Sequence, residues 1–341
     1  MKLSICIPTY NRAVHLANCL NSIILCNSQA EYNFQVCVSD NHSTDETEKV
    51  VRDAQAFIEI KYHKNSYNIG IPRNFLNVVS IAEGDFVWLI GDDDLLIPNA
   101  IADIYKFFEA NQRVDFIYAN SYHLHVEYLK RYPVPFDTVN LPGDMVPFSK
   151  WQVDGEMKFL DMISPQISFD FLGGMYLSIF RKSLWDQNVN QLDQHAIMDD
   201  RTFSHFDNTF PHLKIFAKAF SNSKAYFNSK PLSVCLTGVR EWAPMYPLIR
   251  SVRLVEALSI YRNNGLALWK YLDCKNYALR NALPDFINIV LHKDQSGYSY
   301  VNFFKLSLEY GMYPNFYLSI FYFLGRRLRI FFRGLYTLIT N

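Results

Sequence analysis

Three consecutive acids, Asp92, Asp93 and Asp94, follow the apolar run FVWLIG at residues 86–91. Carboxylates this close repel one another unless a cation lies between them, and their hard oxygen atoms suit Mg²⁺ or Mn²⁺. At the carboxyl end of a sheet strand, such a group could hold a divalent ion against the phosphates of a nucleotide. The structural alternative is a loop whose acid caps a helix beginning near Pro98, although one Asp suffices for a cap. The three acids therefore predict a metal site.

The first two expected strands also end in polar residues. After the first strand, backbone N–H groups of a beginning helix could face a ligand, or the same residues could merely turn the chain. These residues are Pro8, Thr9, Tyr10 and Arg12. After the second strand, Ser43 or Thr44 is expected to cap the next helix. Asp40 is not needed for that cap, so it could accept hydrogen bonds from a nucleobase or ribose.

A further polar turn, with Asn68, Gly70 and Arg73, precedes another expected helix. Gly70 suits a tight turn, and Arg73 on the opening turn of the helix could approach a phosphate. Each motif is weak alone, but their order is specific: PTYNR, SDNxSTD, NxGxxxN, and GDDD about ninety residues into the chain. Over residues 1–120 this series resembles family 2 glycosyltransferases of the GT-A fold.

A second similarity extends beyond these motifs. The segments GGMYLSIFRKSLW at residues 173–185, FPH at 210–212 and KPL at 230–232 are similar to bacterial O-antigen glycosyltransferases of the abequosyltransferase type. This resemblance implies transfer of a sugar from a nucleoside-diphosphate donor to an acceptor hydroxyl, with Mn²⁺ or Mg²⁺ as cofactor. It also implies a Rossmann-like, mostly parallel α/β sheet flanked by helices.

By this resemblance, the nucleoside is contacted by Pro8, Thr9 and Asp40, and the metal is held by the DXD-like acids Asp92, Asp93 and Asp94. The predicted nucleotide-binding residues are Pro8, Thr9, Tyr10, Arg12, Asp40, Asn68, Gly70, Arg73 and Asp92. One departure is Gly91, where many relatives have Asp, so the usual Asp-x-Asp either spans 92 to 94 or has lost its first acid. We favour Asp93 and Asp94 as direct ligands, with Asp92 directed toward the ribose or a water.

An inverting transfer needs a base to deprotonate the acceptor hydroxyl. The segment MDDRT at residues 198–202 resembles the acidic acceptor-side motif of processive family members. Asp200 is therefore the first candidate and Asp199 the second, with two solvated loop acids beside an arginine as the structural alternative. His205, Asp207 and His212 are rivals, because a histidine in a polar cleft titrates near the working pH. His212 could equally cap a helix or bind the leaving diphosphate.

Composition limits the class of partner and the compartment. The 33 basic and 33 acidic residues cancel, which removes any global electrostatic argument for nucleic acid as a partner. The six cysteines form no C-x-x-C pair, and Cys6 and Cys37 lie in apolar runs, so a reducing compartment is expected. The amino-terminal apolar run is too short for a signal peptide. We expect a cytoplasmic protein.

Short β-rich runs alternate with helical patterns over the first 120 residues, which indicates a mostly parallel α/β sheet. The expected strands are Leu3–Ile7, Phe34–Ser39, Ile58–His63, Phe86–Ile90 and Asp115–Ala119. The expected helices are Ala13–Leu25, Thr44–Phe57, Pro72–Ala82 and Pro98–Ala110. Residues 1–120 would bind the nucleotide sugar and 121–240 the acceptor, together forming a domain at 1–240. Residues 241–341 would form a helical C-terminal region.

The last helical segment is amphipathic. Its apolar face is expected to comprise Tyr317, Ile320, Phe321, Leu324, Leu328, Phe331 and Leu335, and its basic face Arg326, Arg329 and Arg333. The apolar run is well short of the ~20 residues of a spanning helix, so the pattern favours a helix lying on anionic lipid. A helix that packs on the protein's own core is the alternative.

Together these features predict a glycosyltransferase that extends a bacterial O-antigen or other surface polysaccharide. The acceptor would be linked to polyprenyl diphosphate, and the enzyme would lie on the cytoplasmic face of the inner membrane. One alternative is a metal-dependent nucleotidyltransferase, which would need a triphosphate-binding Gly/Arg/Lys-rich loop that is not visible early in the chain. The other is a non-catalytic module that binds nucleotide sugar or membrane, against which the intact acids argue.

Overall fold

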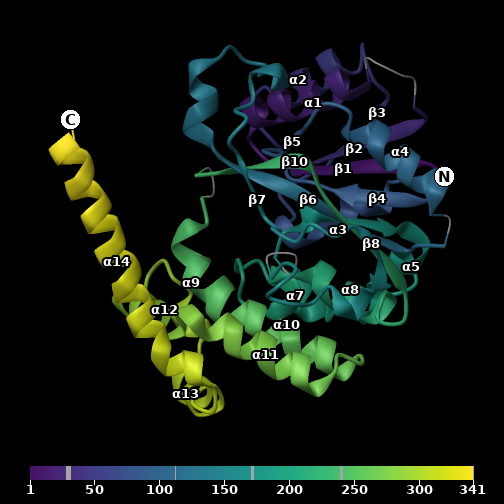
Figure 1. Cartoon of the computed structure of the whole chain (residues 1–341). Helices are drawn as coiled ribbons and strands as arrows, with labels where there is room; N and C mark the ends of the chain where they lie inside the picture. Colours follow the sequence, from purple (N-terminus) through teal and green to yellow (C-terminus); the bar gives the residue numbers. More distant parts are fainter. Residues whose placement is uncertain (28–31, 112, 170–172, 239–240, 341) are drawn as a thin grey trace.

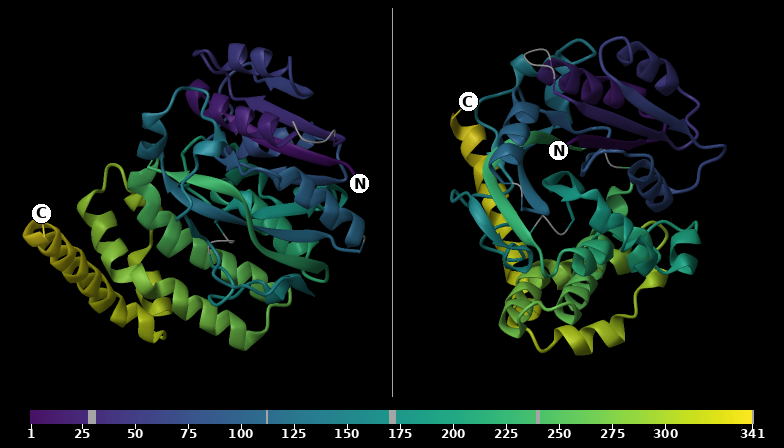
Figure 2. Two further views of the ribbon diagram at one scale, coloured as in Figure 1. Left: turned by 45° about the horizontal axis from the view of Figure 1, so that its top comes forward. Right: turned by 90° about the vertical axis from the view of Figure 1, so that its right-hand side faces the viewer.

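A computed structural model describes the chain except residues 28–31, 112, 170–172, 239–240 and 341, and for residues 330–340 it describes the helical backbone only. One twisted sheet runs through the amino-terminal two thirds, and helices cover its faces (Figures 1 and 2). The carboxy-terminal third is helical and packs against one side of this sheet domain, and its last helix extends away from the rest of the molecule.

The first part of the sheet is parallel. Strand β1 (Leu3–Thr9) lies between β2 (Phe34–Asp40) and β4 (Phe86–Leu89), and β3 (Ile60–Lys64) pairs with β2. Helices α1 (Ala13–Asn27), α2 (Thr47–Ala54) and α3 (Ile71–Ser80) connect these strands. Every residue of β1 and β2 is buried, as expected for parallel strands covered on both faces. Because β1 and β4 are neighbours, their carboxyl ends lie side by side.

The rest of the sheet is mixed. Strand β9 (Ser178–Arg181) is antiparallel to both of its neighbours, β4 and β6 (Phe116–His125). The long strand β10 (Lys224–Thr237) is parallel to β6, and the short β5 (Leu95–Leu96) pairs antiparallel to β10 at the end of the main order β3-β2-β1-β4-β9-β6-β10-β5. Short strands β7 (Val146–Pro147) and β8 (Gly155–Lys158) pair with β6 and β10. The mostly parallel pattern therefore holds for β1 to β4 and for β6 with β10.

Short helices fill the segments between these strands. They are α4 (Ala100–Ala110), α5 (Lys182–Asp186), α6 (Gln194–Met198), α7 (Phe206–Thr209) and α8 (Pro211–Ala219). The expectation that Ser43 or Thr44 caps the second helix was wrong. This helix begins at Thr47, after Glu46 and without a side-chain cap. The Asp45 carboxylate accepts from the Thr47 backbone N–H at 3.1 Å, and the Thr44 N–H donates to Asn11.

The helical region consists of α9 (Tyr246–Leu248), a π-helical turn η8 (Ile249–Arg253), α10 (Leu254–Asn263), α11 (Leu268–Ala278), α12 (Ala282–Leu291), α13 (Phe303–Tyr310) and α14 (Pro314–Thr340). Its core is continuous with that of the sheet domain: Tyr261 of α10 lies against Phe159, with ring centroids 6.1 Å apart. The buried Arg253 donates to the backbone oxygens of Phe203 and Ser204. Over the described parts of the chain, no helix is long and apolar enough to cross a membrane.

Candidate active site

A cavity of about 470 Å³ opens where the carboxyl ends of β1 and β4 meet the helical region. One wall carries Asp92, Asp93 and Asp94, here called the acidic cluster, together with Pro8, Thr9, Tyr10 and Arg12. The same cavity is also lined by Phe203, Phe210, Trp242 and Tyr246, here called the aromatic wall. His212, Glu241 and Arg250 also line the cavity. The cavity therefore joins an acidic end to an apolar one.

Asp92 ties the end of β4 to the end of β1. Its two oxygens accept from Thr9 Oγ1 at 2.8 Å and from Arg12 Nη1 at 2.7 Å. Burial raises the pKa of Asp92 to about 6, and the Arg12 guanidinium opposes that rise. Arg12 also approaches Asp93, with 3.5 Å between Nη1 and Oδ2. With both oxygens bonded inside the protein, Asp92 positions the first turn after β1.

Asp94 and Gly91 explain the departure from the usual motif. The Asp94 carboxylate accepts from the Gly91 backbone N–H at 2.7 Å, which folds the loop back on itself. A Cβ atom at Gly91 would lie 2.7 Å from Asp93 Oδ1, closer than such contacts occur. Glycine at 91 therefore leaves room for the Asp93 carboxylate. The acids do not cap the next helix, because α4 begins after Asn99 without a side-chain cap.

The acidic cluster suits a divalent ion that is held partly by the protein and partly by the phosphates of a substrate. In the part of the chain that the structure describes, no three His, Cys, Asp or Glu side chains surround a common point. Mg²⁺ and similar ions are usually held by one or two carboxylates together with substrate phosphates, rather than by a cage of protein ligands. Asp93, beside the cavity and 14% exposed, provides hard oxygen atoms for such an ion. The donor set therefore fits Mn²⁺ or Mg²⁺.

Asp40 lies at the end of β2 but is not among the residues that line the cavity. It is fully buried and accepts from the Ser43 N–H and the Tyr62 hydroxyl, both at 2.7 Å. Its neighbour Asn41 does line the cavity. In this arrangement Asp40 orders the loop that presents Asn41.

The predicted turn at Asn68 and Gly70 is joined to that same loop. Asn68 Oδ1 accepts from Asn41 Nδ2 at 2.7 Å and from the Gly70 N–H at 2.9 Å. Gly70 has a φ of +85°, in the region that favours glycine, and α3 begins directly after it. The turn therefore fixes the start of α3, whose Asn74 lines the cavity.

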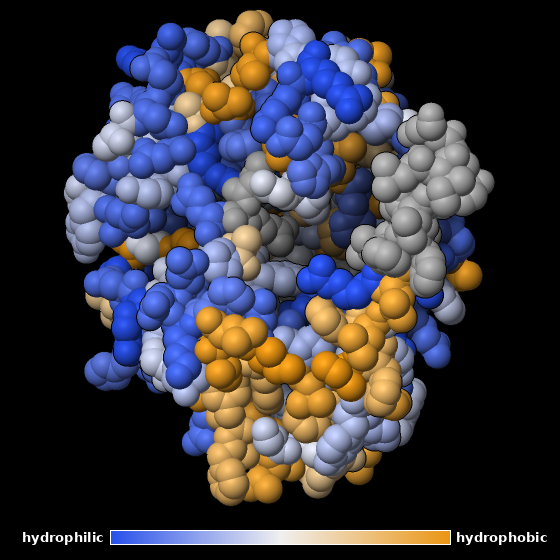
Figure 3. Space-filling model, turned by 90° about the vertical axis from the view of Figure 1, so that its left-hand side faces the viewer, coloured by the Kyte–Doolittle hydropathy of each residue, from blue (hydrophilic) through white to orange (hydrophobic). Residues whose placement is uncertain are grey.

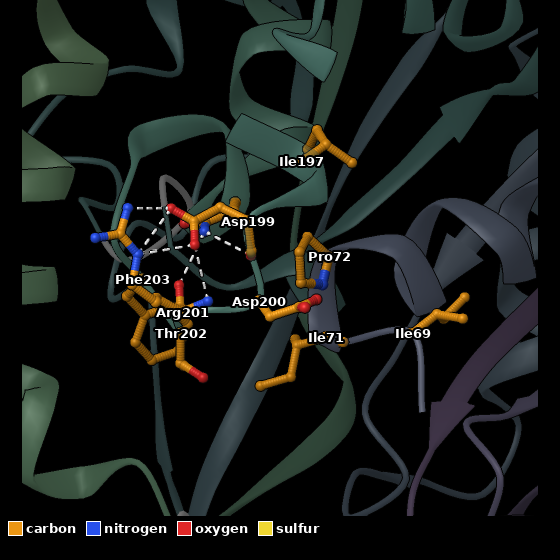
Figure 4. Close-up of a pocket in the computed structure, with 11 residues that line it drawn as sticks. Ile69, Ile71, Pro72, Ile197, Asp199, Asp200, Arg201, Thr202 and Phe203 are labelled. Atoms are coloured by element: carbon orange, nitrogen blue, oxygen red, sulfur yellow. Dashed lines mark hydrogen bonds and ion pairs between the residues drawn. The ribbon is translucent and has the colours of Figure 1, made fainter. Parts of the chain in front are cut away.

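Arg73, predicted to approach a phosphate, and Asp200, predicted as the base for the acceptor hydroxyl, form an ion pair with 2.8 Å between Nη2 and Oδ1. Asp200 is 87% exposed and borders a pocket of about 30 Å³ formed by residues 69–72, Ile197, residues 199–203 and Asn208 (Figure 4). Ile71 and Phe203 line both this pocket and the larger cavity, so the two spaces adjoin. Asp200 and Arg73 are not themselves among the residues that line the larger cavity.

Asp199 is held differently. Figure 4 shows its carboxylate turned toward the Arg201 guanidinium, and the two groups are 2.7 Å apart. Hydrogen bonds from Arg201 and Ser204 hold the pKa of Asp199 well below its usual range, which weakens it as a base. His205 Nε2 lies 3.1 Å from the same carboxylate. Asp207, the remaining acid, accepts from Lys214 Nζ at 2.6 Å.

His212 occupies an apolar site, not the polar cleft that was expected. It is the second residue of α8, is 97% buried, and its ring contacts Phe210 and Phe216 edge-on. Neither ring nitrogen has a hydrogen-bond partner. Burial lowers the pKa of His212 to about 3, so the imidazole is neutral near pH 7.

Several cavity residues were missed by sequence reasoning. Trp242 and Tyr246 stack with ring centroids 6.4 Å apart, and Arg250 lies 5.1 Å from the Tyr246 ring. Arg250 also forms a two-bond ion pair with the buried Asp285 of α12. These residues follow no local motif. The signal that could have found them is the aromatic run EWAPMY at 241–246 directly after a strand.

Comparison with known proteins identifies the family. The model of glycosyl transferase family 2 matches residues 4–175, which is half of the chain. The chain belongs to glycosyltransferase family 2. The predicted family is thereby confirmed, and the matched segment contains β1 to β4 and the acidic cluster.

Two curated relatives show the range of similarity. An abequosyltransferase of Salmonella typhimurium is 32% identical over 69% of this chain and 66% of its own length. A β-1,3-glucosyltransferase of Campylobacter jejuni, named for a GalNAc(5)-diNAcBac-PP-undecaprenol acceptor, is 34% identical over 35% of this chain and 38% of its own length. The chain thus spans less than two thirds of these relatives.

Solved structures confirm the GT-A fold. Staphylococcus aureus TarS (residues 1–349), determined with UDP, matches 83% of this chain and 72% of its own with a TM-score of 0.54 and 17% identity. A mannosyltransferase of Pyrobaculum calidifontis, in complex with GDP-mannose and Mn²⁺, matches 94% of this chain and 84% of its own with a TM-score of 0.50 and 13% identity. At this identity the likeness concerns the fold alone.

Proposed function

We propose that this protein transfers a sugar from a nucleoside-diphosphate donor to a hydroxyl group of a lipid-linked saccharide, in the synthesis of a bacterial O-antigen or other surface polysaccharide. The observation that carries the proposal is the cavity that is lined both by the acidic cluster of a family 2 glycosyltransferase and by the aromatic wall. The name of the abequosyltransferase supports sugar transfer, and that of the undecaprenol-dependent glucosyltransferase supports a lipid-linked acceptor. The structures determined with UDP and with GDP-mannose support a nucleoside-diphosphate donor.

The nucleotide side of the reaction belongs to the ends of β1, β2 and β4. Pro8, Thr9 and Tyr10 line the cavity beside the acidic cluster, and Asp92 fixes Thr9 and Arg12 in place. Asp93 and Asp94 would hold Mn²⁺ or Mg²⁺, which when bound neutralises the charge that develops on the leaving diphosphate. Arg12 adds a fixed cation at the same end of the cavity. The role of Asp40 would be indirect, because it holds the loop that carries Asn41, and Asn41 lines the cavity.

The acceptor side belongs to the segment after β9. Asp200 is the stronger candidate base, because its carboxylate is exposed whereas that of Asp199 is held by Arg201 and Ser204. The ion pair with Arg73 directs the Asp200 carboxylate toward α3. The ion pair is made through Oδ1 and the Asp200 side chain is 87% exposed, so an acceptor hydroxyl could approach the carboxylate from the solvent side. Asp200 would then release Arg73 as it is neutralised.

A lipid-linked acceptor accounts for the surface of the helical region. Figure 3 shows apolar side chains gathered over the part of the molecule that holds α11 to α14. Exposed members include Leu291 of α12, Phe304 and Leu308 of α13, Met312 just after α13, and Tyr317, Phe321, Leu324 and Leu328 of α14. Of the predicted apolar face of α14 up to Leu328, only Ile320 is half-buried and the other members are exposed, which favours a surface helix over one packed on the protein's own core. Phe331, Arg333 and Leu335 lie outside the residues whose side chains are described.

This surface would place the enzyme on the cytoplasmic face of the inner membrane. Basic groups lie beside the apolar face, since Arg327 and Arg329 are exposed on α14. Arg326 of the same helix donates a hydrogen bond to Asn281 Oδ1. A basic amphipathic helix of this kind binds anionic lipid through both buried apolar area and charge. Such binding would hold the cavity near a polyprenyl-diphosphate substrate.

A thermal-shift screen tests the donor part of the proposal. UDP, GDP, CDP and dTDP are each added with and without Mn²⁺, because a ligand that binds only the folded state raises the midpoint of unfolding. We expect one nucleotide to raise the midpoint in a manner that requires Mn²⁺ and the Asp93 carboxylate. No shift with any nucleotide would contradict a nucleoside-diphosphate donor.

A further inference from the structure

His212 is a polar side chain buried in the wall of a binding cavity without a partner. Among the described residues that line the larger cavity, it alone has buried polar side-chain atoms that make no hydrogen bond. Such an arrangement is unfavourable in the free protein, because water has been removed from both nitrogens and nothing replaces it. The cost of burying these two nitrogens would be offset if a bound ligand supplied their missing hydrogen bonds.

The surroundings of His212 indicate the chemistry of that ligand. The aromatic wall beside it is well ordered by its own contacts: Phe203 meets Trp242 edge-on with ring centroids 5.5 Å apart, and Trp242 stacks on Tyr246. A cavity with apolar and aromatic walls and few polar groups suits a ligand that has both an apolar face and hydroxyl groups. A pyranose ring has this character, since its C–H bonds form one face and its hydroxyls project from the edge.

We propose that His212, as a neutral imidazole, hydrogen-bonds a hydroxyl group of a saccharide residue whose apolar face lies on the aromatic wall. A neutral imidazole has one N–H donor and one nitrogen acceptor, and a hydroxyl group can serve as partner to either. His212 is then a specificity-determining residue. The proposal rests on the proposed sugar transfer and names the subsite for the saccharide.

The same geometry opposes a role for His212 as the general base. A base must become positively charged when it takes the proton, and no carboxylate is bonded to this imidazole to stabilise the charge. The nearest rings are those of Phe210 and Phe216, which leave the site apolar. Burial without such a partner lowers the pKa of the group to about 3. A neutral hydrogen-bonding role requires no change of charge.

The saccharide could be the transferred sugar of the donor or the terminal sugar of the acceptor. Both present the same hydroxyl chemistry to His212, so the experiment has two arms. In the first, binding of UDP-glucose, UDP-N-acetylglucosamine, GDP-mannose and dTDP-rhamnose is compared with binding of the bare nucleotides. In the second, transfer from the sugar nucleotide that the wild type uses is measured at varied concentrations of p-nitrophenyl hexosides.

The variants are His212→Leu, which removes both hydrogen bonds, and His212→Gln, which keeps a donor and an acceptor. His63→Leu, at an exposed histidine of β3 outside the cavity, controls for the loss of an imidazole. If the saccharide belongs to the donor, His212→Leu should bind the sugar nucleotide at least tenfold more weakly and the bare nucleotide as tightly as wild type. If it belongs to the acceptor, the KM for the hexoside should rise at least tenfold with donor binding unchanged. His212→Gln should recover much of either loss.

Two outcomes would overturn the inference. They differ in whether the proposed function fails as well. If wild type binds sugar nucleotides and His212→Leu matches it in both arms, His212 is only a core residue and the proposed function stands. If wild type binds no nucleotide and no sugar nucleotide, both proposals fail. Thermal unfolding of each variant shows whether a loss of binding comes from loss of the fold. If His212→Leu does not fold, the binding measurements on His212→Gln distinguish a hydrogen-bonding role of His212 from a purely structural one.

Discussion

Replacing His212 by leucine should remove a weakness of the fold at acid pH. Burial lowers the pKa of His212 to about 3, whereas a histidine in an unfolded chain titrates near ~6.5. Below that pH the unfolded state binds a proton that the folded state does not, so the free energy of unfolding falls as the pH falls. A pH of 5 lies about 1.5 units below the pKa of the histidine in the unfolded chain. At ~1.4 kcal/mol per unit, the free energy of unfolding of the wild type is therefore lower by about 2 kcal/mol at pH 5 than it is above that pKa.

Urea unfolding at pH 8 and at pH 5 measures this effect in wild type, His212→Leu and the surface control His63→Leu. We expect the drop in free energy of unfolding between the two pH values to be smaller by about 2 kcal/mol in His212→Leu than in wild type. At pH 8 the leucine variant should be at least as stable, because it buries no unpaired polar atom. Equal drops in wild type and His212→Leu would refute a buried neutral imidazole.

Four further predictions concern the reaction and the surface. Asp93→Asn should lower transfer by ~10²-fold or more while the fold persists, since it loses a charged metal ligand; unchanged Mn²⁺-dependent turnover would contradict the metal site. Gly91→Ala should raise the Mn²⁺ concentration needed for half activity by ~10-fold, because its Cβ displaces the Asp93 carboxylate; metal titration of activity measures this. Asp200→Asn should lower transfer by ~10²-fold with nucleotide binding retained in calorimetry, and full activity would remove Asp200 as the base. Changing Arg327 and Arg329 to Gln should weaken binding to anionic vesicles by ~1 kcal/mol per charge, as high salt does, and wild-type protein that stays in the supernatant at low salt would mean that this surface does not bind lipid.

The parallel part of the sheet could be predicted from the sequence because its signals are local. The strands β1 to β4 are short apolar runs separated by helical patterns, and their bounds differ from the expected ones by no more than two residues. Strand β10 was harder, because Pro231 lies within it and usually argues against a strand. In the structure the pairing of β10 with β6 shifts register between Asn228 and Ser233, which accommodates the proline.

The site was only partly predictable, because contacts between distant residues depend on strand order. Asp92 and Arg12 were both singled out as nucleotide-side residues, but their ion pair follows from β1 lying beside β4. The pairing of Arg73 with Asp200 likewise joins segments more than a hundred residues apart. Trp242 and Tyr246 carry no motif, so their approach to the acidic cluster needed the whole fold.

The measurement that tests the central claim most directly is release of nucleoside diphosphate from a panel of sugar nucleotides by wild type and by Asp93→Asn, with Mn²⁺ and with EDTA. The account predicts that the wild type releases one nucleotide in the presence of Mn²⁺, and that EDTA or the loss of the Asp93 carboxylate stops the release. Folded wild-type protein that releases no nucleotide from any member of the panel, or release that is equal in Asp93→Asn, would contradict it.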